Sequence, residues 1–343
     1  MRDLTKLPKA HLHLHFTGSL TLDTLYSLAA EQDIRLPSAL QTGMPVHVSA
    51  DKRGWFRFQR LYDAARACVR SEATMRRVVD EAARNDALEG SVRVEIQIDP
   101  TSYAPYVGGI TPALEIVLDE AALASERYAI SVGVIVAASR VRHPLEARTL
   151  ARLAARHAGN GVGGVIGFGL SNDERSGVTE DFAPAFRLAR DAGLASVPHG
   201  GELRGPKHVK QIFEYLQPQR IGHGVRATEN ADVLARLVAA GVAFEVCPTS
   251  NVALGVYPTL ADVPLPQLLA ADATVALGAD DPLLFGSRLT AQYEIARSVH
   301  GLDDFALAGL ARASIRAALA SDSQKTQWLA GVDGWLAEPT SSP

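Results

Sequence analysis

Short β-rich apolar runs alternate with longer Ala-, Leu- and Arg-rich stretches along most of the chain, and this alternation constrains the fold more than any other feature. It is typical of repeated βα units that build a parallel sheet. We expect eight strands, at residues 10–14, 92–98, 130–136, 164–168, 195–198, 220–221, 242–246 and 274–278. Helices are expected between them, at residues 113–127, 144–158, 182–192, 209–216 and 231–240. Eight strands with intervening helices predict a (β/α)8 TIM barrel.

The segment 20–88 interrupts this alternation, because it is too long for a single connection from a strand to the next helix. Residues 22–31 and 55–69 have helical patterns, and insertions at this end of a barrel strand commonly serve catalysis. We therefore expect a helical lid insertion after strand 1. The Ala-rich stretch beyond residue 302 is expected to close the barrel, and residues 339–343 to form a frayed tail. Without a Pro/Gly/Ser-rich linker, residues 1–343 are expected to form one domain.

The composition indicates a soluble globular protein that acts on a small molecule. The 343 residues carry a formal net charge of -4, with 47% hydrophobic and 21% charged residues. This balance offers no basic stripe of the kind that nucleic-acid binding requires. No apolar run has the length of a membrane span, so we expect a cytoplasmic protein without a membrane partner. Cys68 and Cys247 are far apart, which argues against a disulfide framework and against a CxxC metal site.

Residue types that bind metals occur where several predicted strands end. His13 and His15 follow the first apolar run, His199 the fifth and His223 the sixth, and Asp280 stands just after the eighth. Barrel active sites lie at the carboxyl ends of the strands. The sequence therefore predicts that one site is built from four strand ends.

His13 and His15 are two residues apart on a predicted strand, so their side chains share a face and can reach one ion. The alternative is that they simply face solvent, but a barrel strand is covered on both sides and buried imidazoles need partners. With His199 and Asp280, the set has three imidazoles and one carboxylate. That set suits one Zn²⁺ per chain, or another divalent metal, with water in a remaining position.

Four motifs in this order resemble the adenosine deaminase family: Leu7 to His15, Pro198 to Glu202, Gly222 to Gly224 and Asp280 to Pro282. The resemblance spans nearly the whole chain. It implies a zinc-dependent (β/α)8 hydrolase that replaces the amino group at C6 of a purine nucleoside with oxygen and releases ammonia. The CxxC signature of the other zinc-dependent base deaminases is missing from the sequence.

The resemblance also implies roles for individual residues. Glu202 would protonate N1 of the purine, His223 would take a proton from the attacking water, and Asp281 would face N7. A carboxyl group that donates a proton must first hold one, so burial should raise the pKa of Glu202. Two alternatives stay open: Glu202 could orient a ligand histidine, and His223 could be a structural histidine at a strand end. The candidate substrate-binding residues are His15, Thr17, Asn172 and Asp281.

Three positions depart from the family pattern. Thr17 stands where an acidic residue generally bonds the ribose 5′ hydroxyl, and Asn172 stands where a glycine amide meets the purine. Asparagine tolerates left-handed backbone geometry better than most residues, so the amide contact can persist. His11 replaces a common glutamate at the deeper end of the strand, and we interpret it as structural. The neutral Thr17 leaves room for a substituent on the 5′ carbon.

These departures, with the segments 54–62 and 171–174, resemble the actinobacterial branch that deaminates 6-aminodeoxyfutalosine to futalosine in menaquinone biosynthesis. This nucleoside carries a carboxyphenyl ketone at its 5′ end, and an acidic residue would repel its carboxylate. Lys52, Arg53 and Arg57 could bind that carboxylate or could form a solvated basic helix face.

Two other functions stay open. One is the deamination of adenosine or 2′-deoxyadenosine in purine salvage. The other is a non-catalytic barrel that binds metal for a structural or regulatory purpose. Glu202, His223 and Asp281 argue against the second, because a structural metal requires none of them.

Overall fold

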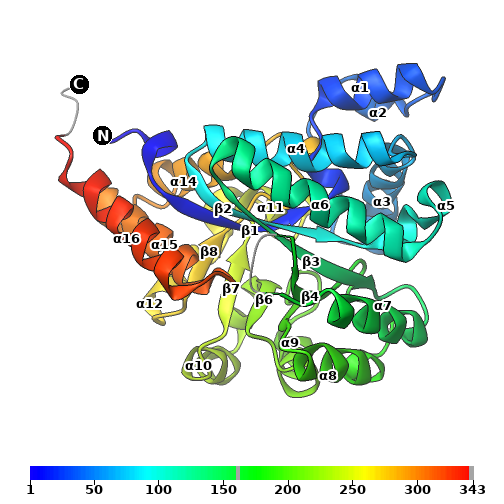
Figure 1. The fold of residues 1–343 in the computed structure, drawn as a ribbon. Coiled ribbons are helices and arrows are strands. Elements are labelled where there is room, and N and C mark those ends of the chain that lie inside the picture. The colour runs from blue at the N-terminus through cyan, green and yellow to red at the C-terminus, as the bar shows by residue number, and fades with distance from the viewer. Residues whose placement is uncertain (160–162, 340–343) are drawn as a thin grey trace.

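A parallel eight-stranded barrel forms the centre of the computed structural model, which describes residues 1–159 and 163–339 (Figure 1). The strands are β1 (Lys9–His15), β2 (Ser91–Ile98), β3 (Ser131–Ser139), β4 (Val165–Ser171), β5 (Ala195–Gly200), β6 (Arg220–His223), β7 (Ala243–Val246) and β8 (Val275–Leu277). Each strand pairs with the next in sequence order. The barrel closes between β1 and the end of β8, where the His15 N–H donates to the Asp280 carbonyl at 3.0 Å. The predicted (β/α)8 barrel is confirmed.

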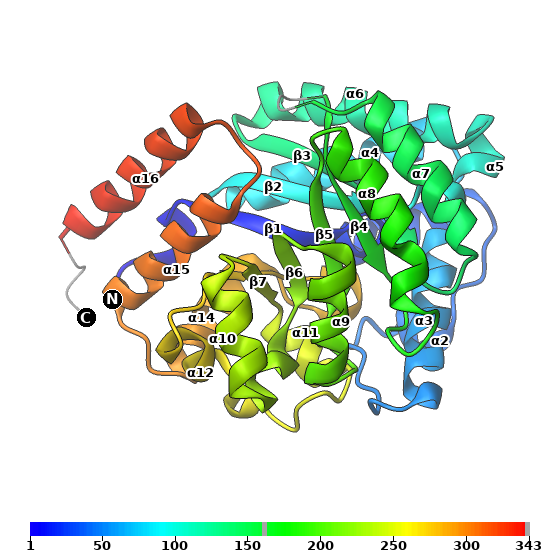
Figure 2. The ribbon, with the colours of Figure 1, turned by 90° about the horizontal axis from the view of Figure 1, so that it is seen from below.

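Helices surround the strands on the outside of the barrel (Figures 1 and 2). They are α1 (Leu22–Glu31), α2 (Ser38–Gln41), α3 (Lys52–Arg66), α4 (Glu72–Leu88), α5 (Ala104–Val107), α6 (Ile110–Tyr128), α7 (Pro144–Arg156), α8 (Ala183–Asp191), α9 (Pro206–Leu216), α10 (Ala231–Ala239), α11 (Pro248–Ala253), α12 (Leu265–Ala270), α13 (Pro282–Phe285), α14 (Leu289–Ser298), α15 (Asp304–Ala317) and α16 (Asp322–Ala337). The helices predicted between the strands are confirmed, with ends that differ by a few residues. Within residues 1–159 and 163–339, no helix is both long and apolar enough to cross a membrane. The predicted tail falls largely on residues 340–343, outside the described part.

The long segment after β1 has two parts with different positions. Helices α2 and α3 lie at the end of the barrel opposite α15 and α16 (Figures 1 and 2). Helix α4 instead packs on α6 and β2, as the ring helix of the first βα unit. A capping box between Ser71 and Thr74 starts α4 afresh after the irregular residues that follow α3. The prediction that the insertion extends to residue 88 is therefore wrong for α4.

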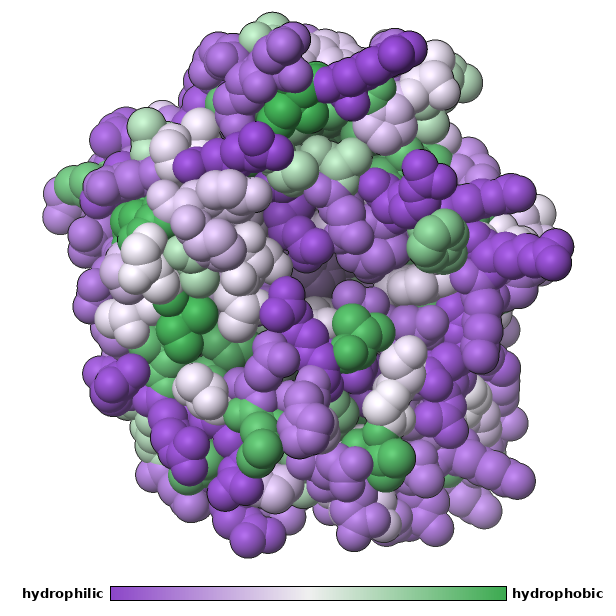
Figure 3. Space-filling model, turned by 90° about the vertical axis from the view of Figure 1, so that its right-hand side faces the viewer, coloured by the Kyte–Doolittle hydropathy of each residue, from purple (hydrophilic) through white to green (hydrophobic). Residues whose placement is uncertain are grey.

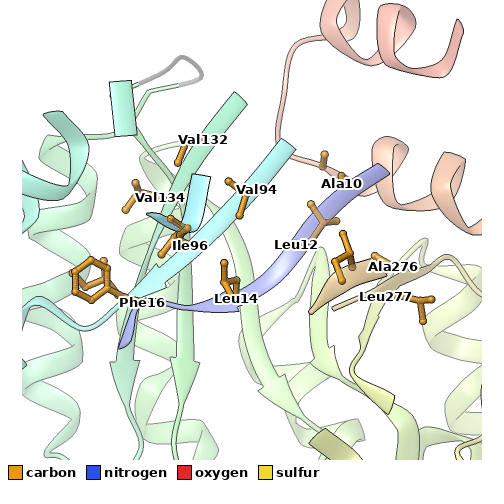
Figure 4. Packing of buried hydrophobic residues seen from close by; sticks show 14 of the residues in the cluster. Ala10, Leu12, Leu14, Phe16, Val94, Ile96, Val132, Val134, Ala276 and Leu277 are labelled. Atoms are coloured by element: carbon orange, nitrogen blue, oxygen red, sulfur yellow. The ribbon is translucent and has the colours of Figure 1, made fainter. Parts of the chain in front are cut away.

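Two apolar clusters hold the barrel together, one inside it and one between strands and helices. The inner cluster consists of Ile135, Ile166, Ala195 and Val197. The outer cluster is much larger, and Figure 4 shows its members along β1, β2 and β3. Both faces of these strands are covered, and β3 is accordingly a nearly continuous apolar run. In β1 and β2, apolar residues alternate instead with buried polar and charged residues such as His13 and Glu95.

An irregularity in β1 separates His11 from the histidines that follow it. His11 pairs in register with Val94, whereas Leu14 pairs with Ile96, so β1 contains one extra residue between them. The His11 Nδ1 atom lies 2.9 Å from Asp86 on α4, and its Nε2 atom accepts the Ala279 N–H at 3.0 Å. These contacts agree with a structural role for His11, and they anchor the backbone immediately before Asp280.

Candidate active site

A cavity of about 490 Å³ opens at the end of the barrel where the strands finish. Figure 3 shows this face of the molecule, with a hollow near its centre that is bordered largely by hydrophilic residues. The volume is within the range of pockets that bind drug-sized ligands. The predicted site residues that line the cavity are His15, Asn172, His199, Glu202, His223, Asp280 and Asp281.

Below the cavity, histidines from three strands converge on Asp280. One nitrogen or oxygen from each of His13, His199, His223 and Asp280 lies within 4.8 Å of the others. His15 stands beside this cluster, because its Nε2 atom is 3.1 Å from the Asp280 Oδ1 atom and 3.1 Å from the His199 Nε2 atom. The structure therefore places three of the four predicted metal ligands in one cluster together with His223, and the fourth, His15, in contact with two members of that cluster.

The donor set and its spacing fit a divalent metal. Four ligands held at 2.0–2.1 Å around a tetrahedral Zn²⁺ would lie about 3.3 Å from one another. The His13 Nε2 atom is 3.4 Å from the Asp280 Oδ1 atom, close to that spacing. The His13 Nε2 atom is also buried without a hydrogen-bond partner among the described residues. Buried imidazoles in this condition are ready to bind a cation.

The charges around His13 also favour a bound cation. Burial lowers the pKa of His13, but the neighbouring carboxylates of Asp280 and Glu245 outweigh burial and raise the pKa to about 10. Two carboxylates therefore stabilise positive charge at this position, whether a proton or a metal ion carries it. The Glu245 Oε2 atom is 2.7 Å from the His13 Nδ1 atom, which leaves Nε2 directed at Asp280.

Three further residues, which no motif in the sequence singles out, fix this cluster. Glu245 lies on β7 and is itself held by Arg220 at 2.6 Å. The Ser250 hydroxyl donates to the Asp280 Oδ2 atom at 2.5 Å, and the Asn251 side chain lies 3.3 Å from the His223 Nδ1 atom. The sequence contains a signal for these residues, because Glu245 is a charged residue within an apolar run, and Ser250 and Asn251 closely follow the end of β7.

The three acids of the site have contrasting environments. Burial and the charge of Asp280 raise the pKa values of Glu202 and Asp281 well above their usual range. Burial acts on Asp280 in the same direction, but hydrogen bonds from His13 and His15 outweigh it and hold its pKa well below the usual range. The site thus holds one ionised carboxylate beside two carboxyl groups that can carry protons, a pattern typical of acid–base catalysis.

Three residues of the cavity wall adopt the left-handed backbone conformation that favours glycine. The φ angles are +76° at Asn172, +61° at His223 and +62° at Asp280. At Asn172 this is the left-handed geometry that asparagine tolerates better than most residues. Such strain persists where the surrounding structure enforces it, and it is concentrated at functional sites.

Thr17, expected to contact the 5′ side of the substrate, lies behind the cavity wall instead. The chain turns into a short 3₁₀ segment, Thr17–Ser19, directly after β1. There the buried Thr17 hydroxyl is 2.5 Å from the hydroxyl of Tyr103, which lines the cavity. Thr17 also bonds Tyr62, another residue of the cavity lining, so Thr17 can influence the substrate through these two tyrosines.

One face of α3 forms the outer wall of the cavity, and basic residues lie at its mouth. Trp55, Gln59, Tyr62 and Arg66 follow one another at helical spacing, and all four line the cavity. Arg142, just after β3, lines it as well. Of the basic residues proposed from sequence, Lys52 lines the cavity, whereas Arg53 and Arg57 are exposed elsewhere on α3. The periodicity of α3 could have identified Arg66.

Comparisons with known proteins agree with this geometry. The family model "Adenosine deaminase" matches residues 8–335. A Streptomyces virginiae protein named "Putative adenosine/adenine deaminase" is 56% identical over 98% of this chain and 98% of its own length. A Mesorhizobium japonicum adenine deaminase is 35% identical over 95% of this chain and 98% of its own length. The crystal structure of an adenine deaminase from Arthrobacter aurescens has a TM-score of 0.88 and 30% identity, and covers 97% of this chain and 100% of that one. The chain therefore belongs to the adenosine deaminase family of metal-dependent hydrolases.

Proposed function

We propose that this chain is a zinc-dependent deaminase of an aminopurine nucleoside that carries an acidic 5′ extension, with 6-aminodeoxyfutalosine as the candidate substrate. The observation that carries the proposal is the extent of the cavity. It runs from Glu202 and Asp281 at its floor to Arg66 and Arg142 at its mouth. A bare purine would leave the outer part of a cavity of about 490 Å³ unfilled.

At the mouth, Arg66 and Arg142 supply the charge that an acidic arm requires. Arg66 pairs with Asp63 at 2.6 Å and Arg142 with Glu146 at 3.2 Å. A guanidinium group has five N–H donors, so each arginine retains donors for a carboxylate. Burial raises the pKa of Asp99, which lines the same region, and the charges of Arg142 and Arg66 oppose this shift.

The metal would be held by His13, His15, His199 and Asp280. A divalent ion held there would lower the pKa of a water molecule toward 7 and so would supply a nucleophile at neutral pH. Burial lowers the pKa of His223 to about 3, so its imidazole is neutral at pH 7. The negative charge of Asp280 opposes this shift and would favour the transfer of a proton from the attacking water to His223. Its Nε2 atom lies 3.7 Å from the Glu202 Oε1 atom, which places the proton acceptor beside the proposed donor.

The remaining residues act on the purine. Burial raises the pKa of Glu202 well above its usual range, which favours the protonated carboxyl group that donates to N1 as the water oxygen bonds to C6. The Asp281 Oδ1 atom is buried without a hydrogen-bond partner in the described structure, so it is free to bond the N7 edge. Breaking the C6–N bond releases ammonia and leaves a 6-oxopurine.

Adenine or adenosine is the second candidate substrate, favoured by the names of the relatives. The Streptomyces and Mesorhizobium proteins are named for these substrates. Deamination of adenine or adenosine requires the same chemistry at C6. It differs from our proposal only in the substrate group that occupies the mouth of the cavity.

Removing the two arginines tests the proposal. We expect Arg66→Gln and Arg142→Gln each to lower kcat/KM for aminodeoxyfutalosine about tenfold or more, the scale of a hydrogen bond to a charged group, and to change kcat/KM for adenosine little. Arg57→Gln is the matched control, because Arg57 is on the same helix and exposed. If both substrates respond equally to the arginine variants, the acidic extension is not recognised there.

A further inference from the structure

We propose that Glu174 and Arg140 are positioning residues that fix the segment from His199 to Arg204, which carries one metal ligand and the proton donor. This inference rests on the proposed function, because it takes Glu202 as the donor. Neither residue belongs to the site described above.

The Glu174 carboxylate binds three consecutive backbone amides. Its Oε2 atom accepts the N–H of Leu203 at 2.7 Å and of Arg204 at 2.8 Å, and its Oε1 atom accepts the N–H of Glu202 at 3.3 Å. Glu174 is completely buried and lies three residues beyond the end of β4. Successive amides around one anion form a concave anion-binding nest, here filled by a side chain of the same protein.

Arg140 holds the other end of the same segment. Its Nη2 atom donates to the carbonyl of His199 at 2.8 Å, and its Nη1 atom donates to the Thr179 hydroxyl at 3.3 Å. Arg140 follows β3 and is 1% exposed. Two oppositely charged groups from adjacent strand ends therefore bracket the backbone from the His199 carbonyl to the Arg204 amide.

The segment needs external support because it has no regular structure of its own. Residues 201–204 form a series of bends between β5 and α9. Gly201 has a φ of +72°, and a Cβ atom on it would lie 2.7 Å from the Val209 Cγ2 atom. Buried amides without partners are costly, and Glu174 supplies partners for three of them.

A purely structural role of Glu174 and Arg140 would affect mainly the stability of the protein, whereas a positioning role would affect mainly turnover. Burying two charges is expensive unless they are paired and hydrogen-bonded, so a network of this kind adds little stability over apolar residues. What the network does specify is the place of Glu202, whose carboxyl group must meet N1 within hydrogen-bond distance. A displacement of about 1 Å there can reduce turnover a hundredfold.

The test compares Glu174→Gln with Glu120→Gln in the metal-loaded protein. Glu120 is 5% exposed and pairs with Arg76 and Arg127 on the outer helices, so it is a buried acid far from the segment. Amide hydrogen exchange, measured by mass spectrometry on peptides that cover residues 201–205, should be about tenfold faster in Glu174→Gln and unchanged in Glu120→Gln. Turnover should fall about a hundredfold in Glu174→Gln alone, with KM changed less than about threefold.

If Glu174→Gln does not fold, Glu174→Asp replaces it, because the shorter side chain keeps the charge but loses reach to the amides. The proposal would be overturned if the amides of residues 201–205 exchanged equally fast in the Glu174 variant and in Glu120→Gln. It would also be overturned if the two variants had similar turnover. The exchange measurement needs no substrate. A wild-type protein that is inactive on every nucleoside would therefore refute the proposed function, while the exchange ratio would still decide the positioning role.

Discussion

Gly18 stands against Asp281, and replacing it with alanine tests whether the position of that carboxyl group controls the reaction. A Cβ atom on Gly18 would lie 1.8 Å from the Asp281 Oδ1 atom and 2.8 Å from its Cα atom. Because the backbone of Asp281 is also too close, a rotation of its side chain cannot relieve the contact. Asp281 must move as a whole.

The size of the effect follows from that distance. Ordinary contacts begin near 3.4 Å, so the Cβ atom and the carboxyl oxygen must separate by about 1.6 Å. A displacement of about 1 Å in a reacting group can cost a hundredfold in rate. We therefore expect kcat/KM to fall at least about a hundredfold, or about 2.7 kcal/mol.

The assay follows the ultraviolet absorbance change as the aminopurine is converted to the 6-oxopurine, with metal content measured on the same samples. Gly334→Ala is the control, because no atom lies within 4 Å of a Cβ at this helical position. The control should be fully active and about 0.5–1 kcal/mol more stable. A Gly18→Ala protein with metal bound and kcat/KM within threefold of wild type would refute the placement of Asp281 at the reaction.

Three further predictions concern the metal, the proton donor and the fold. The double variant His13→Ala, His199→Ala should lose the bound metal, and elemental analysis that finds one equivalent per chain would contradict the proposed ligand set. Glu202→Gln should keep the metal and lose at least about a hundredfold in kcat, the usual scale for general acid catalysis; near-normal turnover would assign the proton to another group. Burial lowers the pKa of Lys9 from 10.5 to about 8. Between these two pH values the folded state therefore binds fewer protons than the unfolded state, so the free energy of unfolding should rise with pH. Chemical denaturation between pH 8 and 10.5 should show a smaller rise for Lys9→Met than for wild type, and an identical rise would show that Lys9 does not carry the effect.

The order of the strands and the floor of the site could be predicted from the sequence because local rules determine both. Alternating apolar and helical runs identify the strands, and the rule that barrel sites lie at strand ends predicts that His13, His199 and Asp280 lie together. These residues are held by the backbone of regular elements, so their positions follow once the barrel is recognised.

Other parts of the site depend on contacts that no local pattern records. Thr17 was expected in the cavity, but the turn after β1 pairs its hydroxyl with Tyr103, which is distant in sequence. The bonds from Glu174 to Glu202 and its two neighbours likewise join loops that follow different strands. Helix α4 was assigned to the insertion because its amphipathic pattern does not show whether it covers the barrel wall or the barrel mouth.

The rate of deamination by the wild-type protein on several substrates tests the central claim most directly. Aminodeoxyfutalosine, adenosine and adenine are supplied side by side at equal concentration to zinc-loaded protein, and both the absorbance change and the released ammonia are measured. We predict that kcat/KM for aminodeoxyfutalosine exceeds the other two at least about tenfold, because only this substrate reaches the arginines at the mouth. A higher kcat/KM for adenosine or adenine would contradict the proposed substrate, and no ammonia from any of the three would contradict the proposed chemistry.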